Sequence, residues 1–144
     1  MKKQSEEILA EIYRNAQLAL QSISDVLPEV EDGLTRDELC KQHEEYEKFS
    51  SRALVIAKNK DIDLKEPNPF KKAMMWGSIK MSALKDNSRS HIADMMLQGT
   101  VMGISALRSS QNMAKPNEDD EVLALLDEMI KAEERFEKTW KELL

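Results

Sequence analysis

A chain of 144 residues is long enough to form one domain with a sizeable core, and we treat residues 1–144 as a single domain. Its formal net charge of −6 disfavours nonspecific binding to nucleic acid or to anionic membranes. Four Gly, four Pro, two Trp, two Tyr and three Phe are too few turn and β-forming residues for a β-sandwich.

Three further features of the sequence concern the location of the protein in the cell. No run of about 18 apolar residues is present that could span a bilayer. The N-terminus leads into a charged amphipathic segment and lacks the apolar stretch of a signal peptide. Cys40 is the single cysteine, which excludes an internal disulfide and is typical of a reducing compartment. We therefore expect a cytoplasmic protein with no nucleic-acid partner and no membrane partner.

The first half of the chain predicts two helices of similar length. Apolar residues recur at helical spacing through residues 4–27, and Pro28 ends this first helix. Thr35 and Glu38 form a capping-box pattern, which predicts that the second helix begins at Thr35 and continues to Asn59.

The second half predicts three further helical segments. Asn68 and Pro69 are typical of a helix start, and helical character then continues to residue 113. The residues Lys-Asp-Asn-Ser at 85–88 favour a break, so we expect a crossover helix at 69–85 and a third bundle helix at 88–112. A fourth bundle helix, capped by Asn117, is expected to run to residue 143.

These lengths predict an all-α fold. Roughly 28 residues lie between the second and third bundle helices, enough to carry the chain back along the bundle. This is the plan of a ferritin-like four-helix bundle with a helical crossover between the second and third bundle helices. The alternative is an up-down bundle whose third helix is long and bent.

Glu133 interrupts the apolar face of the fourth helix. It lies near the middle of a stripe at helical spacing. The stripe consists of Val122, Leu126, Met129, Ile130, Phe136, Trp140 and Leu144. A carboxylate in this position needs a cation, a metal, a donor network or a proton, because an unpaired buried charge costs several kcal/mol. Arg14, Arg52 and Arg89 are candidate donors.

The third helix is apolar around most of its circumference. Its polar residues are confined to one arc that includes Asp94, Gln98 and Ser105. Seven of the nine Met lie at 74–113, and Met side chains suit adaptable interfaces. We therefore expect this helix to be covered by the crossover helix or to form a subunit interface, giving a homo-oligomer or a contact with a protein partner.

The stretches Trp76-Gly-Ser-Ile-Lys-Met81 and Ser90-His-Ile-Ala-Asp-Met-Met-Leu-Gln-Gly-Thr-Val-Met-Gly-Ile104 resemble a family of uncharacterised bacterial ferritin-like four-helix-bundle proteins. The resemblance covers most of the chain and is sharpest in these two stretches. It implies a ferritin-like bundle and implies no particular activity.

Ferritin-like di-iron proteins carry Glu-x-x-His on two helices, and that pattern occurs on no helix of this chain. Phe136 stands where the histidine would follow Glu133. A degenerate site for iron or manganese remains an alternative, with its ligands drawn from Glu133, His43, Glu47, Glu11 and Asp94. His43 falls within the apolar arc of the second helix, where it is either a core histidine or a partner of Glu133.

Two functions from different classes follow from these patterns. The first is a non-enzymatic helical module with a degenerate ferritin-like core, which self-associates or binds a partner through the third helix and the crossover helix and needs no cofactor. The second is a ferritin-like metal-binding protein with a polar site around Glu133. No sequence motif indicates a reaction, and we expect that the protein is not an enzyme.

Overall fold

The structure, a computed structural model, describes residues 2–65, 80–114 and 119–144, and within these ranges the chain forms helices and no strands. The long helices are α1 (Lys2–Val26), α2 (Gly33–Asn59), α4 (Arg89–Met113) and α5 (Asp120–Glu142). A short 3-10 helix, η1 (Leu27–Glu29), follows α1, and residues 80–85 are also helical. The expectation of an all-α fold is confirmed.

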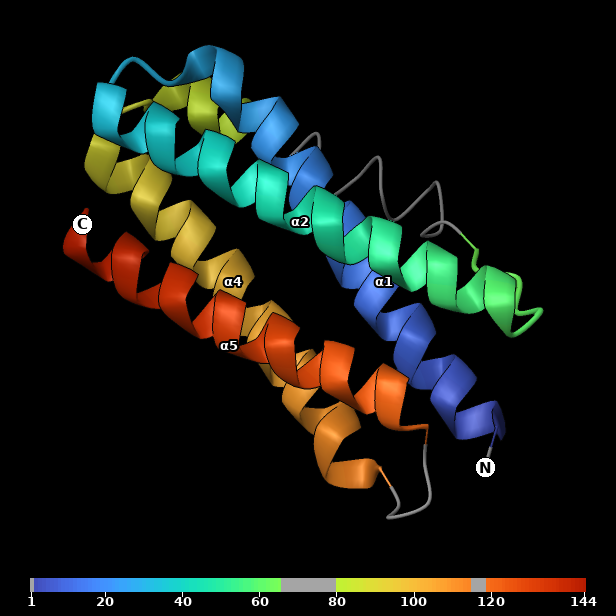
Figure 1. The fold of residues 1–144 in the computed structure, drawn as a ribbon. Coiled ribbons are helices and arrows are strands. Elements are labelled where there is room, and N and C mark those ends of the chain that lie inside the picture. The colour runs from blue at the N-terminus through green and yellow to red at the C-terminus, as the bar shows by residue number, and fades with distance from the viewer. Residues whose placement is uncertain (1, 66–79, 115–118) are drawn as a thin grey trace.

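The long helices form two antiparallel pairs (Figure 1). α1 packs along α2, α4 packs along α5, and the two pairs contact each other through α1 with α4, α1 with α5 and α2 with α5. The core between them is built from the apolar stripe of each helix. Ile12, Ala16 and Ile23 of α1 lie in it with Leu126 and Met129 of α5.

Contacts at the helix ends establish the direction of each helix. Lys60, just after α2, pairs with Asp119, just before α5, at 2.5 Å. At the opposite end of the bundle, Asn87, just before α4, donates a hydrogen bond of 2.9 Å to the carbonyl of Glu29, just after α1. The chain therefore leaves α2 at one end and enters α4 at the other, so α2 and α4 run parallel (Figure 1). Most of the crossover helix expected at 69–85, with its start at Asn68 and Pro69, lies outside the described residues.

Two expected helix starts are wrong. α2 begins at Gly33 rather than Thr35, because Asp32 is its N-cap and accepts a 3.0 Å hydrogen bond from the backbone N–H of Thr35. α5 begins at Asp120, because the side chain of Asp119 accepts hydrogen bonds from the backbone at the helix start. In both cases an aspartate competes successfully for the capping role. Asn117, which we expected to cap the fourth helix, lies outside the described residues.

The expected break at 85–88 is confirmed. Asp86 accepts a 2.9 Å hydrogen bond from the backbone N–H of Ser88, which stabilises the turn. Ser88 is the N-cap of α4 and accepts a 3.3 Å hydrogen bond from the backbone N–H of His91. Asp, Asn and Ser thus end one helix and start the next, as their local hydrogen bonding favours.

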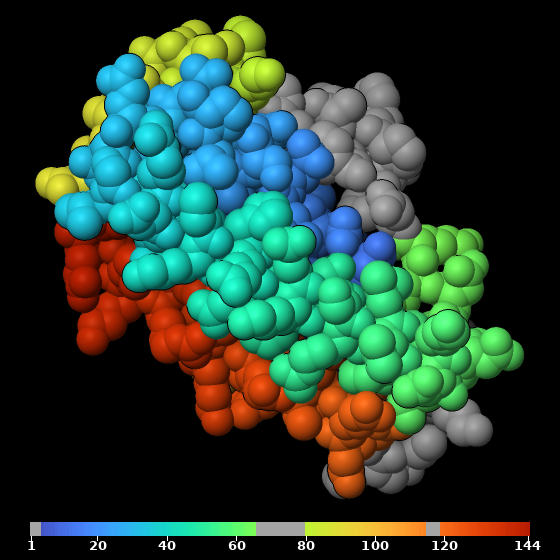
Figure 2. Space-filling view, turned by 45° about the horizontal axis from the view of Figure 1, so that its top comes forward, coloured from blue at the N-terminus to red at the C-terminus, as the bar shows by residue number. Residues whose placement is uncertain are grey.

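One face of the molecule is formed by α1, α2 and α5 together. Figure 2 shows the side chains of α2 (cyan to green) lying directly against those of α5 (orange to red). Ion pairs join the two helices here, with Arg52 of α2 bonded to Glu128 of α5 at 2.6 Å and Arg135 of α5 bonded to Glu45 of α2 at 2.9 Å. Among the described helices, none is both long enough and apolar enough to cross a membrane.

Candidate functional site

Glu133 lies in the core, as the apolar stripe of α5 predicts. Its side chain is 1% exposed, and the stripe residues from Val122 to Trp140 are buried around it. The stripe ends earlier than expected, because Leu144 lies beyond the last residue of α5 and is exposed. A carboxyl group is therefore held in an interior that is otherwise mostly apolar, and its partners determine its charge.

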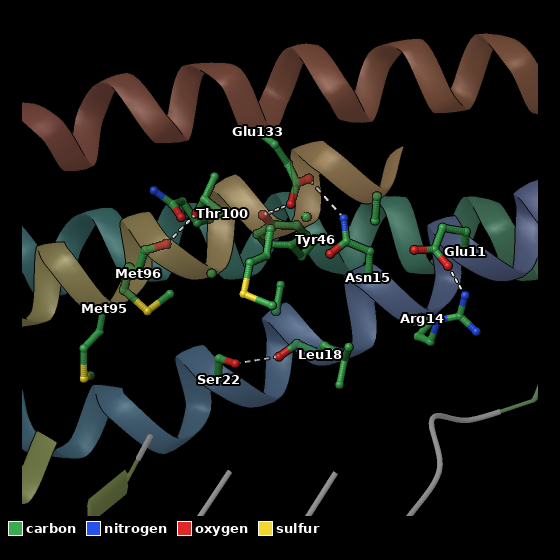
Figure 3. Close-up of a pocket in the computed structure, with 16 residues that line it drawn as sticks. Glu11, Arg14, Asn15, Leu18, Ser22, Tyr46, Met95, Met96, Thr100 and Glu133 are labelled. Carbon is green, nitrogen blue, oxygen red and sulfur yellow. Dashed lines mark hydrogen bonds and ion pairs between the residues drawn. The ribbon is translucent and has the colours of Figure 1, made fainter. Parts of the chain in front are cut away.

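Two neutral groups bond the Glu133 carboxyl group. The Tyr46 hydroxyl of α2 donates to Glu133 Oε2 at 2.5 Å, and the Asn15 amide of α1 donates to Glu133 Oε1 at 3.0 Å. The side chains come from three helices and meet at one level of the bundle (Figure 3). A hydrogen-bond network, one of the environments expected for this carboxyl group, is what the structure contains.

The arginines considered as donors to Glu133 bond elsewhere. Arg14 pairs with Glu11, its neighbour on α1. Arg52 points to the surface and binds Glu128 through two hydrogen bonds of 3.2 and 2.6 Å. Both arginines are about half exposed, since a long charged side chain on a helix flank keeps its head in water. Arg89, the third candidate, is also exposed.

Burial controls the ionisation of the site. Removal of Glu133 from water raises the pKa of its carboxyl group to about 7, although the hydrogen bonds from Tyr46 and Asn15 act in the opposite direction. Burial and the neighbouring carboxylate raise the pKa of the Tyr46 hydroxyl well above its usual value. At neutral pH the tyrosine is therefore a hydrogen-bond donor, and Glu133 is divided between its charged and neutral forms.

Gly103 of α4 provides the space for this carboxyl group. A Cβ atom at position 103 would lie 2.9 Å from Glu133 Oε1, 3.0 Å from Glu133 Oε2 and 2.9 Å from Asn15 Oδ1. Any larger residue would therefore displace the polar cluster. Gly99, one turn earlier, has nothing within 4 Å of the corresponding position. Of the two glycines in the Gly99-x-x-x-Gly103 sequence, only Gly103 is thus closely approached by side chains of other helices.

A cavity of about 430 Å³ extends from the Glu133 cluster between α1 and α4 (Figure 3). Its volume lies within the range of small-molecule pockets. Most of its wall is apolar, and Glu133, Tyr46 and Asn15 are among its polar lining residues. Its apolar and small lining residues are Leu18 and Ala19 of α1 and Met95, Met96, Gly99, Met102, Gly103 and Ala106 of α4.

The other polar side chains of the cavity are occupied within the protein. The Thr100 hydroxyl donates to the carbonyl of Met96 at 2.7 Å, and the Ser22 hydroxyl donates to the carbonyl of Leu18 at 2.8 Å. The Gln42 amide donates to Glu38 at 2.9 Å. A hydroxyl that donates to its own helix has no base beside it, so neither Ser nor Thr is arranged as a nucleophile.

The residues considered as metal ligands are not gathered around Glu133. His43 is 33% exposed and bonds Glu47 at 3.1 Å on the outer side of α2. Asp94 is exposed and accepts a hydrogen bond from Gln98 at 3.0 Å. Glu11 lines the rim of the cavity but is paired with Arg14. Within the described ranges, no three His, Cys, Asp or Glu side chains are grouped so that they could hold a metal ion.

The expected placement of His43 in the apolar arc of α2 is wrong. α2 turns Gln42 and Tyr46 toward the core, so His43 falls at the edge of the buried face. Sequence patterning also missed Asn15 as a partner of Glu133. Its position between Ile12 and Ala16 of the α1 stripe is the signal that could have identified it, because a residue beside a buried stripe can reach the interior.

The surface of α4 is partly apolar, as the composition of this helix predicts. Val101 is 44% exposed and Met102 is 74% exposed. Met81 and Leu84, in the helical residues at 80–85, are also exposed. The expected polar arc faces outward, since Asp94, Gln98 and Ser105 are all exposed.

Comparison with known proteins adds no assignment. The chain matches no protein-family model, no curated protein and no solved structure.

Proposed function

We propose that this protein is a ferritin-like four-helix bundle whose function is to bind a small amphipathic molecule without transforming it. The cavity beside Glu133 carries this proposal. A well-packed bundle of this size has few voids, so a space of about 430 Å³ with mostly apolar walls and one polar end is the feature to explain. The ferritin-like arrangement is supported by the parallel course of α2 and α4 (Figure 1).

The chemistry of the lining favours binding over catalysis. Glu133 has the ionisation of a general base, but Tyr46 is held in its protonated form and the Ser22 and Thr100 hydroxyls donate to backbone carbonyls. Glu11 is neutralised by Arg14 at the rim. The described lining therefore offers a hydrophobic enclosure with a polar end, and its serine and threonine hydroxyls are not arranged as nucleophiles.

An organic ligand also fits the lining better than a metal ion does. Among the described residues, Glu133 is the one interior carboxylate that faces the cavity, and no second or third metal-ligating side chain is grouped with it. Met95, Met96 and Met102 supply adaptable apolar contact area, which suits a hydrophobic ligand body.

A cavity-filling variant tests the proposal. In Gly99→Leu the new side chain enters open space in the cavity wall, since a Cβ atom at Gly99 meets nothing within 4 Å. Ser105→Leu adds the same side chain to an exposed position of α4 outside the lining, and it is the matched control. We expect the neutral dye Nile red to bind the wild type and Ser105→Leu, and to bind Gly99→Leu at least about tenfold more weakly. Equal binding by all three proteins would contradict a ligand site in this cavity.

A second candidate function is self-association through α4, which is favoured by the exposed Val101 and Met102 side chains. An exposed apolar patch that persists on a folded helix often marks a contact surface. Sedimentation velocity of the wild type and of Val101→Lys tests it: we expect an oligomer that the lysine dissociates. A wild-type monomer at micromolar concentration contradicts it and leaves the cavity proposal unaffected.

A further inference from the structure

The polar end of the cavity selects the chemistry of the ligand, and we infer that this ligand is a protonated amine attached to an apolar body. The inference rests on the proposed binding function and specifies its ligand class. Three observations carry it: the grouping of oxygen acceptors at one end of the cavity, the engagement of the nearby hydroxyl donors within the protein, and the absence of a free counter-charge for Glu133 in the described cavity lining.

Three oxygens are packed against the bare face of Gly103. The two Glu133 carboxylate oxygens and Asn15 Oδ1 all lie 2.9–3.0 Å from the position that a Cβ atom of Gly103 would occupy. The Asn15 amide is held in this orientation because its nitrogen donates to Glu133 Oε1. The cavity continues from this point between α1 and α4 (Figure 3). Its polar end is therefore a cluster of acceptors.

The interior hydroxyl donors of the lining, and one N–H of each interior amide, are already engaged. The Tyr46 hydroxyl and the Asn15 amide donate to Glu133, and the Gln42 amide donates to Glu38. The Ser22 and Thr100 hydroxyls donate to the carbonyls of their own helices. A ligand group that bonds the ionised Glu133 carboxylate must therefore bring its own donor. A carboxylate on the ligand would be repelled by an ionised Glu133.

Charge distinguishes an ammonium group from a neutral donor. The ionisable groups that line the cavity around Glu133 are Tyr46 from α2 and the Glu11–Arg14 pair from α1, while the α4 lining is uncharged. Within the part of the lining that the structure describes, no unpaired cation thus balances an ionised Glu133. A buried carboxylate is stabilised strongly by a bonded cation, and an ammonium group offers N–H donors to the Glu133 carboxylate oxygens. The apolar walls, which include Met95 and Met96, then enclose the rest of the ligand.

Three molecules with one alkyl chain and different heads separate this inference from the proposed function. Octylamine, octanol and octanoate share the same apolar body, and each is titrated against Nile red bound to the wild-type protein. At about pH 8, where Glu133 is mainly ionised, we expect octylamine to bind about tenfold more tightly than octanol, and octanoate to bind most weakly. Octanol binding equal to octylamine binding overturns the inference and leaves the binding function standing. Failure of all three to displace the dye contradicts the proposed function itself.

The preference for octylamine over octanol, measured in Glu133→Gln and at different pH values, is a readout that general hydrophobic binding does not affect. Glutamine has nearly the same shape as glutamate and carries no charge, so the preference for octylamine over octanol should fall to about equality while octanol binding is retained. In the wild type the preference should also fall at about pH 5.5, because Glu133 is then mainly protonated. Circular dichroism verifies that the variant is folded. If Glu133→Gln still binds octylamine more tightly than octanol, the preference arises from the acidic surface of the protein, and the inference is overturned.

Discussion

Gly103 and Glu133 are packed so closely that the Glu133 carboxyl group can occupy its position only because residue 103 has no side chain. A Cβ atom at Gly103 would lie 2.9 and 3.0 Å from the two carboxylate oxygens. Those oxygens cannot move freely, because Tyr46 and Asn15 hold them by hydrogen bonds. The polar cluster, the close approach of α4 and one end of the cavity therefore depend on one another.

Gly103→Ala should destabilise the protein, whereas Gly99→Ala should stabilise it. Replacing a glycine inside a helix by alanine gains about 1 kcal/mol, and at Gly99 nothing opposes this gain because the new methyl group enters open space. At Gly103 the methyl group overpacks a hydrogen-bonded cluster, which typically costs about 1–3 kcal/mol. We expect a net loss of about 1 kcal/mol, measured as the free energy of unfolding in urea. A Gly103→Ala variant as stable as Gly99→Ala would show that the carboxyl group is not confined there.

Substitutions of Glu133 should separate hydrogen bonding from charge. Glu133→Gln keeps the shape of the side chain, and the Asn15 amide can turn to offer its oxygen, so we expect a change in stability within about 1 kcal/mol. Glu133→Leu leaves the Tyr46 hydroxyl and the Asn15 amide without their acceptor and should cost about 1–3 kcal/mol. Chemical denaturation of both variants at about pH 7 tests this. A loss for Glu133→Gln as large as that for Glu133→Leu would indicate a bonded cation.

The free energy of unfolding should decrease as Glu133 ionises. Its pKa is about 7 in the folded protein and 4.5 for a glutamate fully exposed to water, so between these values the folded state holds a proton that the unfolded state has lost. Stability contributed by this group is fully present below pH 4.5, falls as the pH rises toward about 7 and is constant above that. The loss is up to about 3 kcal/mol.

Glu133→Gln is the reference for this pH dependence. Surface aspartates such as Asp119 and Asp127 have pKa values lowered by neighbouring lysines, so their contribution has the opposite sign and is lost as the pH falls. Both proteins contain these aspartates, so their contribution cancels when the free energy of unfolding of Glu133→Gln is subtracted from that of the wild type. We expect that difference to fall between about pH 4.5 and about pH 7, and parallel profiles for the two proteins would mean that Glu133 ionises as freely as a surface carboxylate.

The sequence was sufficient for the helices and for the burial of Glu133. The spacing of apolar residues is repeated over several helical turns, so the inner face of α5 was predicted almost residue by residue. The ends of helices depend on single hydrogen bonds. Asp32 and Asp119 took the capping roles assigned to Thr35 and Asn117, and the choice among neighbouring capping residues depends on the loop geometry.

The partners of Glu133 could not be obtained from the sequence, because they depend on how far each helix is displaced along its neighbours. Asn15 and Tyr46 are 118 and 87 residues from Glu133 in the chain. The sequence pattern placed His43 on the buried face of α2, and a small rotation of that helix decides whether His43 or Tyr46 reaches the centre. The structure selects Tyr46 and leaves His43 at the edge.

Tyr46→Phe isolates the shortest hydrogen bond in the cluster. The variant removes the hydroxyl that donates to Glu133 at 2.5 Å and retains the ring, whose centroid lies 5.4 Å from that of Phe136. Losing this donor should cost about 1–2 kcal/mol of stability. It should also raise the pKa of Glu133 further, because the Tyr46 hydrogen bond favours the charged carboxylate. The chemical shift of the Glu133 carboxyl carbon followed by NMR across pH measures that pKa directly, with Asn15→Ala as a parallel test of the second donor. An unchanged titration in Tyr46→Phe would mean that the hydroxyl does not stabilise the charged form, and that burial alone controls the ionisation of this site.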